Sequence, residues 1–163
     1  MKRLRRILTV MLALTMVIGL VTPMSVQAAT TRKCTMTFSQ SLAGLNLSSS
    51  NSNVAKITKV NDSKYVVSDV AAGKTVTKAT VNGKTYKTTV KISVNSKGYP
   101  TLTFTADDNM TITTTNKNII SVKSSDISNG VVRYTIKFKT AGTATLKLAV
   151  NGVNCGSCKC KIE

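Results

Sequence analysis

An internal repeat limits what this chain of 163 residues can fold into more than any other feature of its sequence. The stretch "LNLSSSNSNVAKI" at 45–57 aligns without a gap with "MTITTTNKNIISV" at 110–122. Further along, "AAGKTVTKATVNGK" at 71–84 matches "TAGTATLKLAVNGV" at 140–153. The sequence therefore predicts two copies of one small fold.

The residues of both copies favour β-strands. Threonine, valine and isoleucine dominate the periodic stretches, and side chains branched at Cβ suit a pleated surface better than a helix. Asn82-Gly83 and Asn151-Gly152 each lie between alternating runs, which is a strong hairpin signal. Turn-bounded runs indicate about six strands per copy. The predicted fold class is all-β, with two tandem small antiparallel β-sandwich domains after a leader peptide.

The predicted boundary between the copies lies in "NSKGY" at 95–99, where Gly98 and Pro100 interrupt the strand pattern. We expect a short linker there. One domain then covers residues 29–96 and the other covers residues 97–163.

The first 28 residues have the layout of a secretory signal peptide. Basic residues come first, an uncharged apolar run follows from Ile7 to Leu20, and small residues end at Ala28. The apolar run is shorter than the roughly 20 residues that a membrane-spanning helix needs. We expect cleavage after Ala28 and a secreted, extracellular or cell-wall-associated product that meets a membrane only through this leader. The alternative is a leader retained as an anchor.

Two longer segments carry a family resemblance. The segment "NSNVAKITKV…VAAGKTVTKATVNGKTYKTTVKISV" and its counterpart "NKNIISVKS…FKTAGTATLKLAVNG" resemble bacterial immunoglobulin-like (Ig-like) domains of group 2 in their first short strand, Ala-Gly corner and closing hairpin. The resemblance covers nearly all of both copies. It implies a small Ig-like β-sandwich that serves exported and surface proteins as a stalk, an adhesin segment or a sugar-binding accessory. Its motifs are packing and turn signals, and a fold alone does not carry a function.

The predicted mature chain is strongly basic. Without the leader, 19 lysines and arginines stand against six acidic residues, a net charge of +13. This excess favours polyanions, and we expect an anionic cell-wall polymer or an acidic polysaccharide as partner, with no specific nucleic acid. The alternative is that the lysines only form a solvated face that keeps the protein soluble.

Catalytic chemistry finds no support in the sequence. The chain has no histidine, which removes the commonest general base and the commonest metal ligand. Its few acidic residues lie in turn-like segments and form neither a catalytic pair nor a calcium loop. We predict that the protein is not an enzyme and has no catalytic residue, cofactor or metal.

Aromatic rings that could contact a ligand are few, because the chain has no tryptophan. The candidate ligand contacts are Tyr65, Tyr86 and Tyr99. Tyr99 lies in the expected linker, so packing between the two domains is its alternative role.

The closing strand of the second copy contains Cys155, Cys158 and Cys160. Disulfides are the default in an exported protein, and we predict one among these three cysteines. A Cys158–Cys160 bond would strain a strand, whereas Cys155 can reach either partner if the chain turns at Gly156. Cys34 begins the first copy and lies far from the tail in an end-to-end tandem. It is then a free thiol or bonds another protein chain.

Two functions fit these observations. The first is a secreted or cell-surface interaction module that binds a wall polymer or acidic polysaccharide, or acts in adhesion, through its basic surface. The second is a structural spacer or assembly subunit that has no ligand of its own and can be disulfide-linked to a partner.

Overall fold

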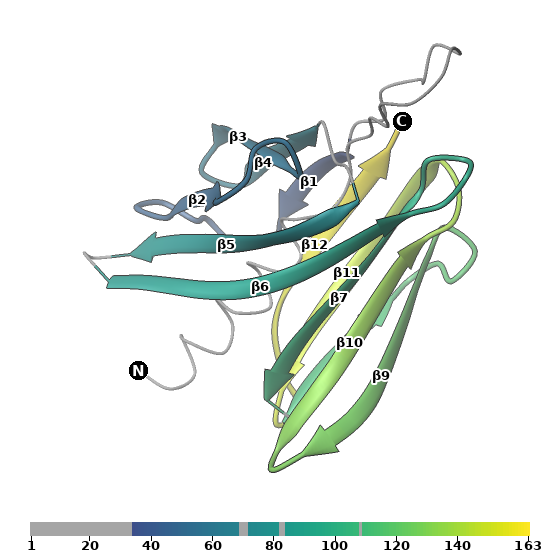
Figure 1. The fold of residues 1–163 in the computed structure, drawn as a ribbon. Helices are drawn as coiled ribbons and strands as arrows, with labels where there is room; N and C mark the ends of the chain where they lie inside the picture. Colours follow the sequence, from purple (N-terminus) through teal and green to yellow (C-terminus); the bar gives the residue numbers. More distant parts are fainter. Residues whose placement is uncertain (1–33, 69–71, 82–83, 108) are drawn as a thin grey trace.

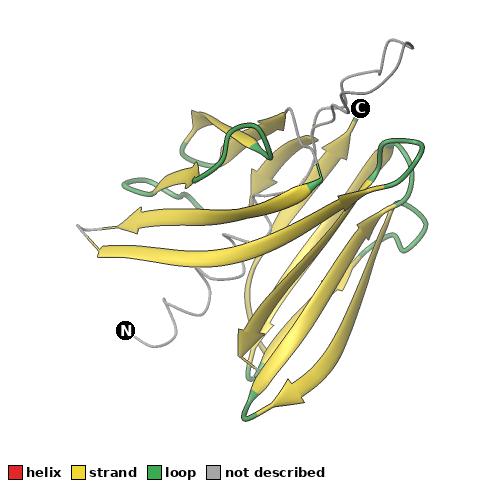
Figure 2. Ribbon diagram, viewed as in Figure 1, coloured by secondary structure: helices red, strands yellow, loops and turns green. Residues whose placement is uncertain are grey.

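The computed structural model describes residues 34–68, 72–81, 84–107 and 109–163. Every regular element in this part of the chain is a β-strand (Figure 2). The predicted signal peptide, residues 1–28, lies outside the described residues. Among the described residues, no helix is long and apolar enough to cross a membrane.

Each copy contributes six strands to the described structure, as the turn-bounded runs predicted. The first copy forms β1 (Cys34–Phe38), β2 (Asn46–Ser49), β3 (Lys56–Asn61), β4 (Lys64–Ser68), β5 (Gly73–Val81) and β6 (Lys84–Val94). The second copy forms β7 (Pro100–Asp107), β8 (Met110–Thr114), β9 (Ile120–Ser128), β10 (Val131–Phe138), β11 (Gly142–Val150) and β12 (Val153–Ile162).

The strands form two six-stranded antiparallel sheets, and each sheet runs through both copies (Figure 1). We call β3-β4-β1-β12-β11-β8 the terminal sheet, because it pairs the first strand with the last. We call β2-β5-β6-β7-β10-β9 the central sheet. Each copy supplies three neighbouring strands to each sheet, and the copies meet at the β1–β12 and β6–β7 pairs.

The hairpins agree with the turn signals where the structure describes them. Val150 pairs with Val153, and the Asn151-Gly152 turn between them has φ values of 52° and 75°, which Asn and Gly tolerate best. In the first copy Val81 pairs with Lys84, and the two turn residues between them lie outside the described residues.

The segment at 95–99, expected to be a linker, is the tight turn of the β6–β7 hairpin. The Gly98 N–H donates to the Asn95 carbonyl at 2.8 Å. The Asn95 side-chain oxygen accepts hydrogen bonds from the backbone N–H of Lys97 at 3.0 Å and of Tyr99 at 2.8 Å. The turn is closed by its own residues, so paired strands connect the two copies directly.

The buried apolar side chains of both copies form a single cluster between the sheets. In β10, buried side chains alternate with exposed or half-buried ones, as the sequence of this strand predicted. The largest fully buried side chains come from both copies: Tyr65, Phe138, Met36, Leu102, Ile120, Ile136 and Leu146.

Equivalent residues of the two sequence repeats make equivalent contacts in the structure. The Tyr65 hydroxyl donates to the Leu45 carbonyl at 3.2 Å, and the Tyr134 hydroxyl donates to the Met110 carbonyl. Leu45 and Met110 occupy the same position of the repeat. A phenylalanine ring packs on each tyrosine, at centroid distances of 6.1 and 5.8 Å. Both copies therefore anchor the start of their second strand in the same way.

The Ala-Gly corner of each copy is another matched feature. A Cβ atom at Gly73 would lie 2.8 Å from Val54 Cγ2, and one at Gly142 would lie 2.8 Å from Ile119 Cδ1. Val54 and Ile119 also share one repeat position. Close packing therefore disfavours a side chain at both corners, and at Gly142 a φ of 135° does so as well.

Replacing Gly142 by alanine should lower the free energy of unfolding by roughly 1–3 kcal/mol, because the new methyl group meets Ile119 and the backbone is held at positive φ. Gly152→Ala is the matched control, because Gly152 has a φ of 75° and a Cβ atom there would have no neighbour within 4 Å. Urea unfolding of both variants measures the difference. A Gly142→Ala variant no less stable than Gly152→Ala would contradict the packing argument.

Candidate functional site

Lysines gather on the outer face of the central sheet. Side chains of β5 and β6 alternate between the core and solvent, and four lysines lie on the outer side. The strand register places Lys74 directly opposite Lys91 and Lys78 directly opposite Lys87. Like charges directly opposite one another in a sheet repel and lower stability. A bound anion would relieve this repulsion.

The same face continues into the second copy. Lys91 lies opposite Thr103 of β7, Thr103 lies opposite Thr135 of β10, and Thr135 lies opposite Lys123 of β9. Threonine and serine fill most of the space between the cations. We define the basic face as the seven basic side chains on the outer side of the central sheet: Lys74, Lys78, Lys87, Lys91, Lys123, Arg133 and Lys137.

No carboxylate lies on the basic face among the side chains that the structure describes. The ion pairs of the described residues join Lys59 to Asp62 at 2.7 Å and Lys161 to Glu163. Both pairs belong to strands or turns of the terminal sheet. Neither of these ion pairs involves a cation of the basic face.

A second feature is a buried thiol cluster on the terminal sheet. The β1–β12 register places Met36 opposite Cys160 and Cys34 opposite Ile162, so Cys34 and Cys160 are diagonal neighbours on one face. The sulfur atoms of Cys158 and Cys160 lie 3.9 Å apart. Cys160 is thus the central member of the cluster.

The expectation that Cys34 lies far from the tail is wrong. It assumed two domains arranged end to end, whereas the first and last strands are paired. Cys34, Cys158 and Cys160 are at most 2% exposed, and the terminal sheet and the core cover them.

Hydrogen bonds among the three thiols separate their pKa values. Side-chain hydrogen bonds from Cys158 and Cys34 hold the pKa of Cys160 well below its ordinary value, against the opposing effect of burial. The hydrogen bond to Cys160, and then burial, raises the pKa of Cys34. Burial, and then the hydrogen bond to Cys160, raises the pKa of Cys158.

Among the described residues, no group of three cysteine, aspartate, glutamate or histidine side chains is arranged to hold a metal ion. The chemistry that the cluster offers is that of thiols.

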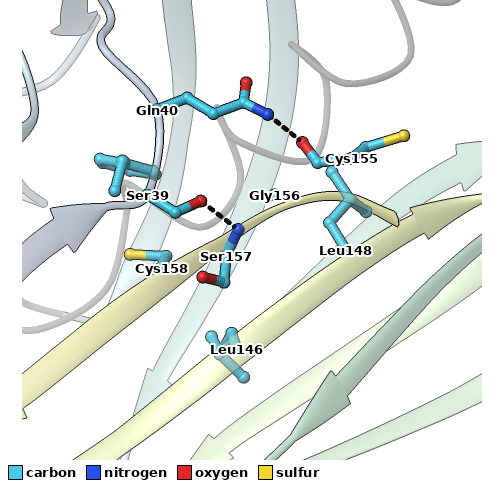
Figure 3. Close-up of a pocket in the computed structure, with 9 residues that line it drawn as sticks. Ser39, Gln40, Leu146, Leu148, Cys155, Gly156, Ser157 and Cys158 are labelled. Atoms are coloured by element: carbon cyan, nitrogen blue, oxygen red, sulfur yellow. Dashed lines mark hydrogen bonds between the residues drawn. The ribbon is translucent and has the colours of Figure 1, made fainter. Parts of the chain in front are cut away.

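Cys155 lies apart from the cluster (Figure 3). Its sulfur atom and that of Cys158 point in opposite directions in this view. The Gln40 side chain donates to the Cys155 carbonyl at 3.1 Å, and the Ser157 N–H donates to the Ser39 hydroxyl at 2.8 Å. These bonds attach the start of β12 to the segment after β1. The structure therefore brings Cys158 and Cys160 together, adds Cys34, and leaves Cys155 outside.

A small cavity of about 20 Å³ lies beside these contacts (Figure 3). That volume holds about one water molecule. Its walls come from the segment after β1 and from β11 and β12. This cavity is too small for a sugar or another organic ligand.

The three tyrosines predicted as ligand contacts all have inward positions. Tyr65 has no exposed surface, so a ligand contact does not fit its position. Tyr99 is 7% exposed, and its hydroxyl accepts a hydrogen bond from the Ala141 N–H at 3.1 Å, within the second copy. Tyr86 is half-buried and packs against the core opposite Ala79. None of these rings forms an open stacking platform.

The basic face was not predicted from the sequence as a defined surface, although a signal for it was present. A two-residue turn at Asn82-Gly83 places residue 81 opposite 84, and the lysine pairs of β5 and β6 then follow by counting back along the strands. Cys34 gave no such signal, because the β1–β12 pair joins residues from opposite ends of the chain.

Comparison with known proteins finds a distant similarity to domains of the S-layer protein SbsC. A crystal structure of rSbsC is 16% identical, with a TM-score of 0.28, and the match covers 72% of this chain and 20% of that chain. A structure of SbsC domains 5-6 is 20% identical, with a TM-score of 0.27, and the match covers 89% of this chain and 95% of that chain. No family model and no curated protein sequence matches the chain. The similarity is limited to distant all-β architecture.

Proposed function

We propose that this protein is an exported, non-catalytic module of a bacterial cell surface that binds an anionic polymer across its basic face. In this proposal the two copies are Ig-like sandwiches that follow a cleaved signal peptide. The observation that carries the proposal is the set of seven outward cations, two pairs of which lie directly opposite each other, with no carboxylate among the described side chains of that face.

The shape of the face favours a polymer over a small ligand. Neighbouring strands are about 4.8 Å apart, so cations on β5, β6, β9 and β10 present positive charge at repeated intervals across a broad surface. Threonine and serine hydroxyls between the cations can donate hydrogen bonds to phosphate or carboxylate oxygens. The cavity beside β12 is too small for a ligand. An extended polyanion can instead contact many of these groups at once.

The expected affinity is moderate and depends on several contacts together. A lysine near an anionic surface contributes about 0.5–1 kcal/mol, so seven cations would supply roughly 4–7 kcal/mol. That range corresponds to dissociation constants from about 1 mM to about 10 μM. Among the described residues no aromatic ring lies open for stacking on neutral sugars, so we expect charge, not sugar identity, to select the ligand.

The purified protein should bind alginate, a polycarboxylate, and poly(glycerol phosphate), a polyphosphodiester, but not neutral dextran. Binding should weaken at least tenfold when salt rises from about 50 mM to about 200 mM, because salt screens exposed charges. Titration followed by calorimetry at several salt concentrations measures this, with dextran as the matched control. Absence of binding to both polyanions at low salt would contradict the proposal and leave the structural spacer as the function.

A further inference from the structure

We propose that two chains exchange their second copies at high concentration and form a dimer. In this dimer the first copy of each chain pairs with the second copy of the other, so the partner is a second molecule of this chain. The inference rests on the seams between the copies and does not depend on polymer binding.

The first copy alone leaves two of its strands without a neighbour on one side. β1 pairs with β4 of its own copy and with β12 of the second copy. β6 pairs with β5 of its own copy and with β7 of the second copy. Without a second copy, β1 and β6 would become sheet edges, whose unpaired backbone N–H and C=O groups are templates for pairing with another chain. The first copy therefore needs a second copy, whichever chain supplies it.

Both seams have the character of a protein core. At the β6–β7 seam, Ile92 lies opposite Leu102, and both side chains are at most 2% exposed. At the β1–β12 seam, no inward side chain of either strand is more than 4% exposed. Interfaces between obligate partners are apolar in the same way, like a domain core cut in half. These inward side chains of β1 and β12 are Cys34, Met36, Phe38, Cys158, Cys160 and Ile162.

The chain passes from one copy to the other through the β6–β7 turn at 95–99 (Figure 1). Asn95 closes this turn, because its backbone N–H donates to the Tyr99 carbonyl at 3.1 Å and its side-chain oxygen accepts from Lys97 and Tyr99. If the turn extends, the second copy reaches the first copy of a neighbouring chain. The strand pairs of both seams then form between chains, and the bonds of the turn are lost. Exchange of this kind is a low-cost route to dimers.

Protein concentration decides between the closed monomer and the exchanged dimer. A short connection holds two linked units at an effective concentration of about 1 mM or more, so pairing within one chain prevails in dilute solution. A neighbouring chain competes when the protein itself approaches that concentration. Each closed unit of the dimer then contains a basic face built from two chains, because Lys91 of β6 lies opposite Thr103 of β7 across the seam.

Refolding at two protein concentrations tests the proposal. The protein is unfolded in urea with a reductant, which excludes disulfides between chains, and is refolded at about 1 μM and at about 1 mM. Size-exclusion chromatography with light scattering measures the mass of the products. We expect monomer at the low concentration and an added dimer at the high one. The dimer should persist after dilution, because its return to monomer requires both seams to separate.

A variant of the turn sharpens the test. Asn95 is exposed and lies outside the paired residues of both seams, and Asn95→Ala removes the acceptor of two turn hydrogen bonds. We expect this variant to raise the ratio of dimer to monomer at least tenfold, because these bonds exist only in the closed turn. Asn61→Ala is the matched control. Asn61 is also exposed and accepts from the Ser63 N–H at 3.0 Å, but its turn joins β3 to β4 within one copy. This control should stay within about twofold of the unaltered protein.

Contacts across the seam distinguish exchange from a side-by-side dimer. Dimer is refolded from equal amounts of isotope-labelled and unlabelled chains, and isotope-filtered NOE spectra then record contacts between chains. Exchange predicts a contact between Ile92 of one chain and Leu102 of the other. A dimer without this contact, the absence of dimer from both the unaltered protein and Asn95→Ala, or an equal response of Asn61→Ala and Asn95→Ala would each overturn the proposal.

Discussion

Replacing Lys74, Lys78, Lys87 and Lys91 together by glutamine should weaken alginate binding at low salt by roughly 30- to 1,000-fold. The four lysines lie in two directly opposed pairs on β5 and β6. Each lysine near an anionic surface contributes about 0.5–1 kcal/mol, so four of them contribute about 2–4 kcal/mol. Calorimetric titration of the variant beside the unaltered protein measures the loss.

A matched control removes the same charge from the other sheet. Lys56, Lys64, Lys147 and Lys159 lie on the outer side of the terminal sheet, and their replacement by glutamine lowers the net charge equally. We expect this control to weaken binding less than about fivefold, through long-range attraction alone. Equal losses in both variants would show that net charge binds the polymer without a defined face.

Stability gives an independent readout of the same substitutions. Removing two opposed lysine pairs relieves repulsion worth about 0.2–1 kcal/mol per pair, so the β5–β6 variant should be at least as stable as the unaltered protein. A variant that loses binding while keeping or gaining stability identifies a surface retained for a ligand. A variant that loses both would indicate that the lysines support the fold.

Replacing Leu102 by alanine should lower the free energy of unfolding by about 2–5 kcal/mol. Leu102 is fully buried on β7, where it lies opposite Ile92 of the first copy and Ile136 of the second. The truncated side chain leaves a cavity at the seam, so both copies should be destabilised in one cooperative transition. Urea unfolding, followed by circular dichroism and by hydrogen exchange in each copy, measures the loss and its extent.

Thr103→Ala is the control for this substitution. Thr103 is the next residue of β7 and points to the outer face, so its replacement should change stability by no more than about 0.5 kcal/mol. Two separate transitions, with only the second copy affected by Leu102→Ala, would show that the copies fold independently despite the shared sheets.

The sequence contained enough information to predict the strands within each copy. Alternation in β10 and the Asn151-Gly152 turn are local signals, and each depends only on neighbouring residues. The joining of the copies was not predictable in this way. The residues around Ile92 and Leu102 alternate like those of any half-buried strand, and nothing in their pattern specifies which distant strand lies beside them.

The candidate sites differ in the same way: one follows from local strand pairing and the other from pairing between distant strands. The opposed lysine pairs follow from the register of a local hairpin, so they could have been predicted from the sequence. The neighbouring positions of Cys34 and Cys160 depend on the β1–β12 pair, which joins residues from opposite ends of the chain. The inward positions of Tyr65 and Tyr99 likewise result from tertiary packing, because a tyrosine in an alternating strand suits either face.

The two seams have a consequence for how many copies such an assembly can hold. Each seam joins the last strand of one copy to the first strand of the other. Exchanging the two copies therefore converts one sheet order into the other, as a twofold axis does for the subunits of a symmetric dimer. An interface of that kind is self-limiting. The first and last strands of both copies are already paired at the two seams. A third copy therefore finds no free first or last strand with which to form the same kind of seam. A chain of such units could lengthen only by stringing together finished pairs, with the pair as the unit of growth.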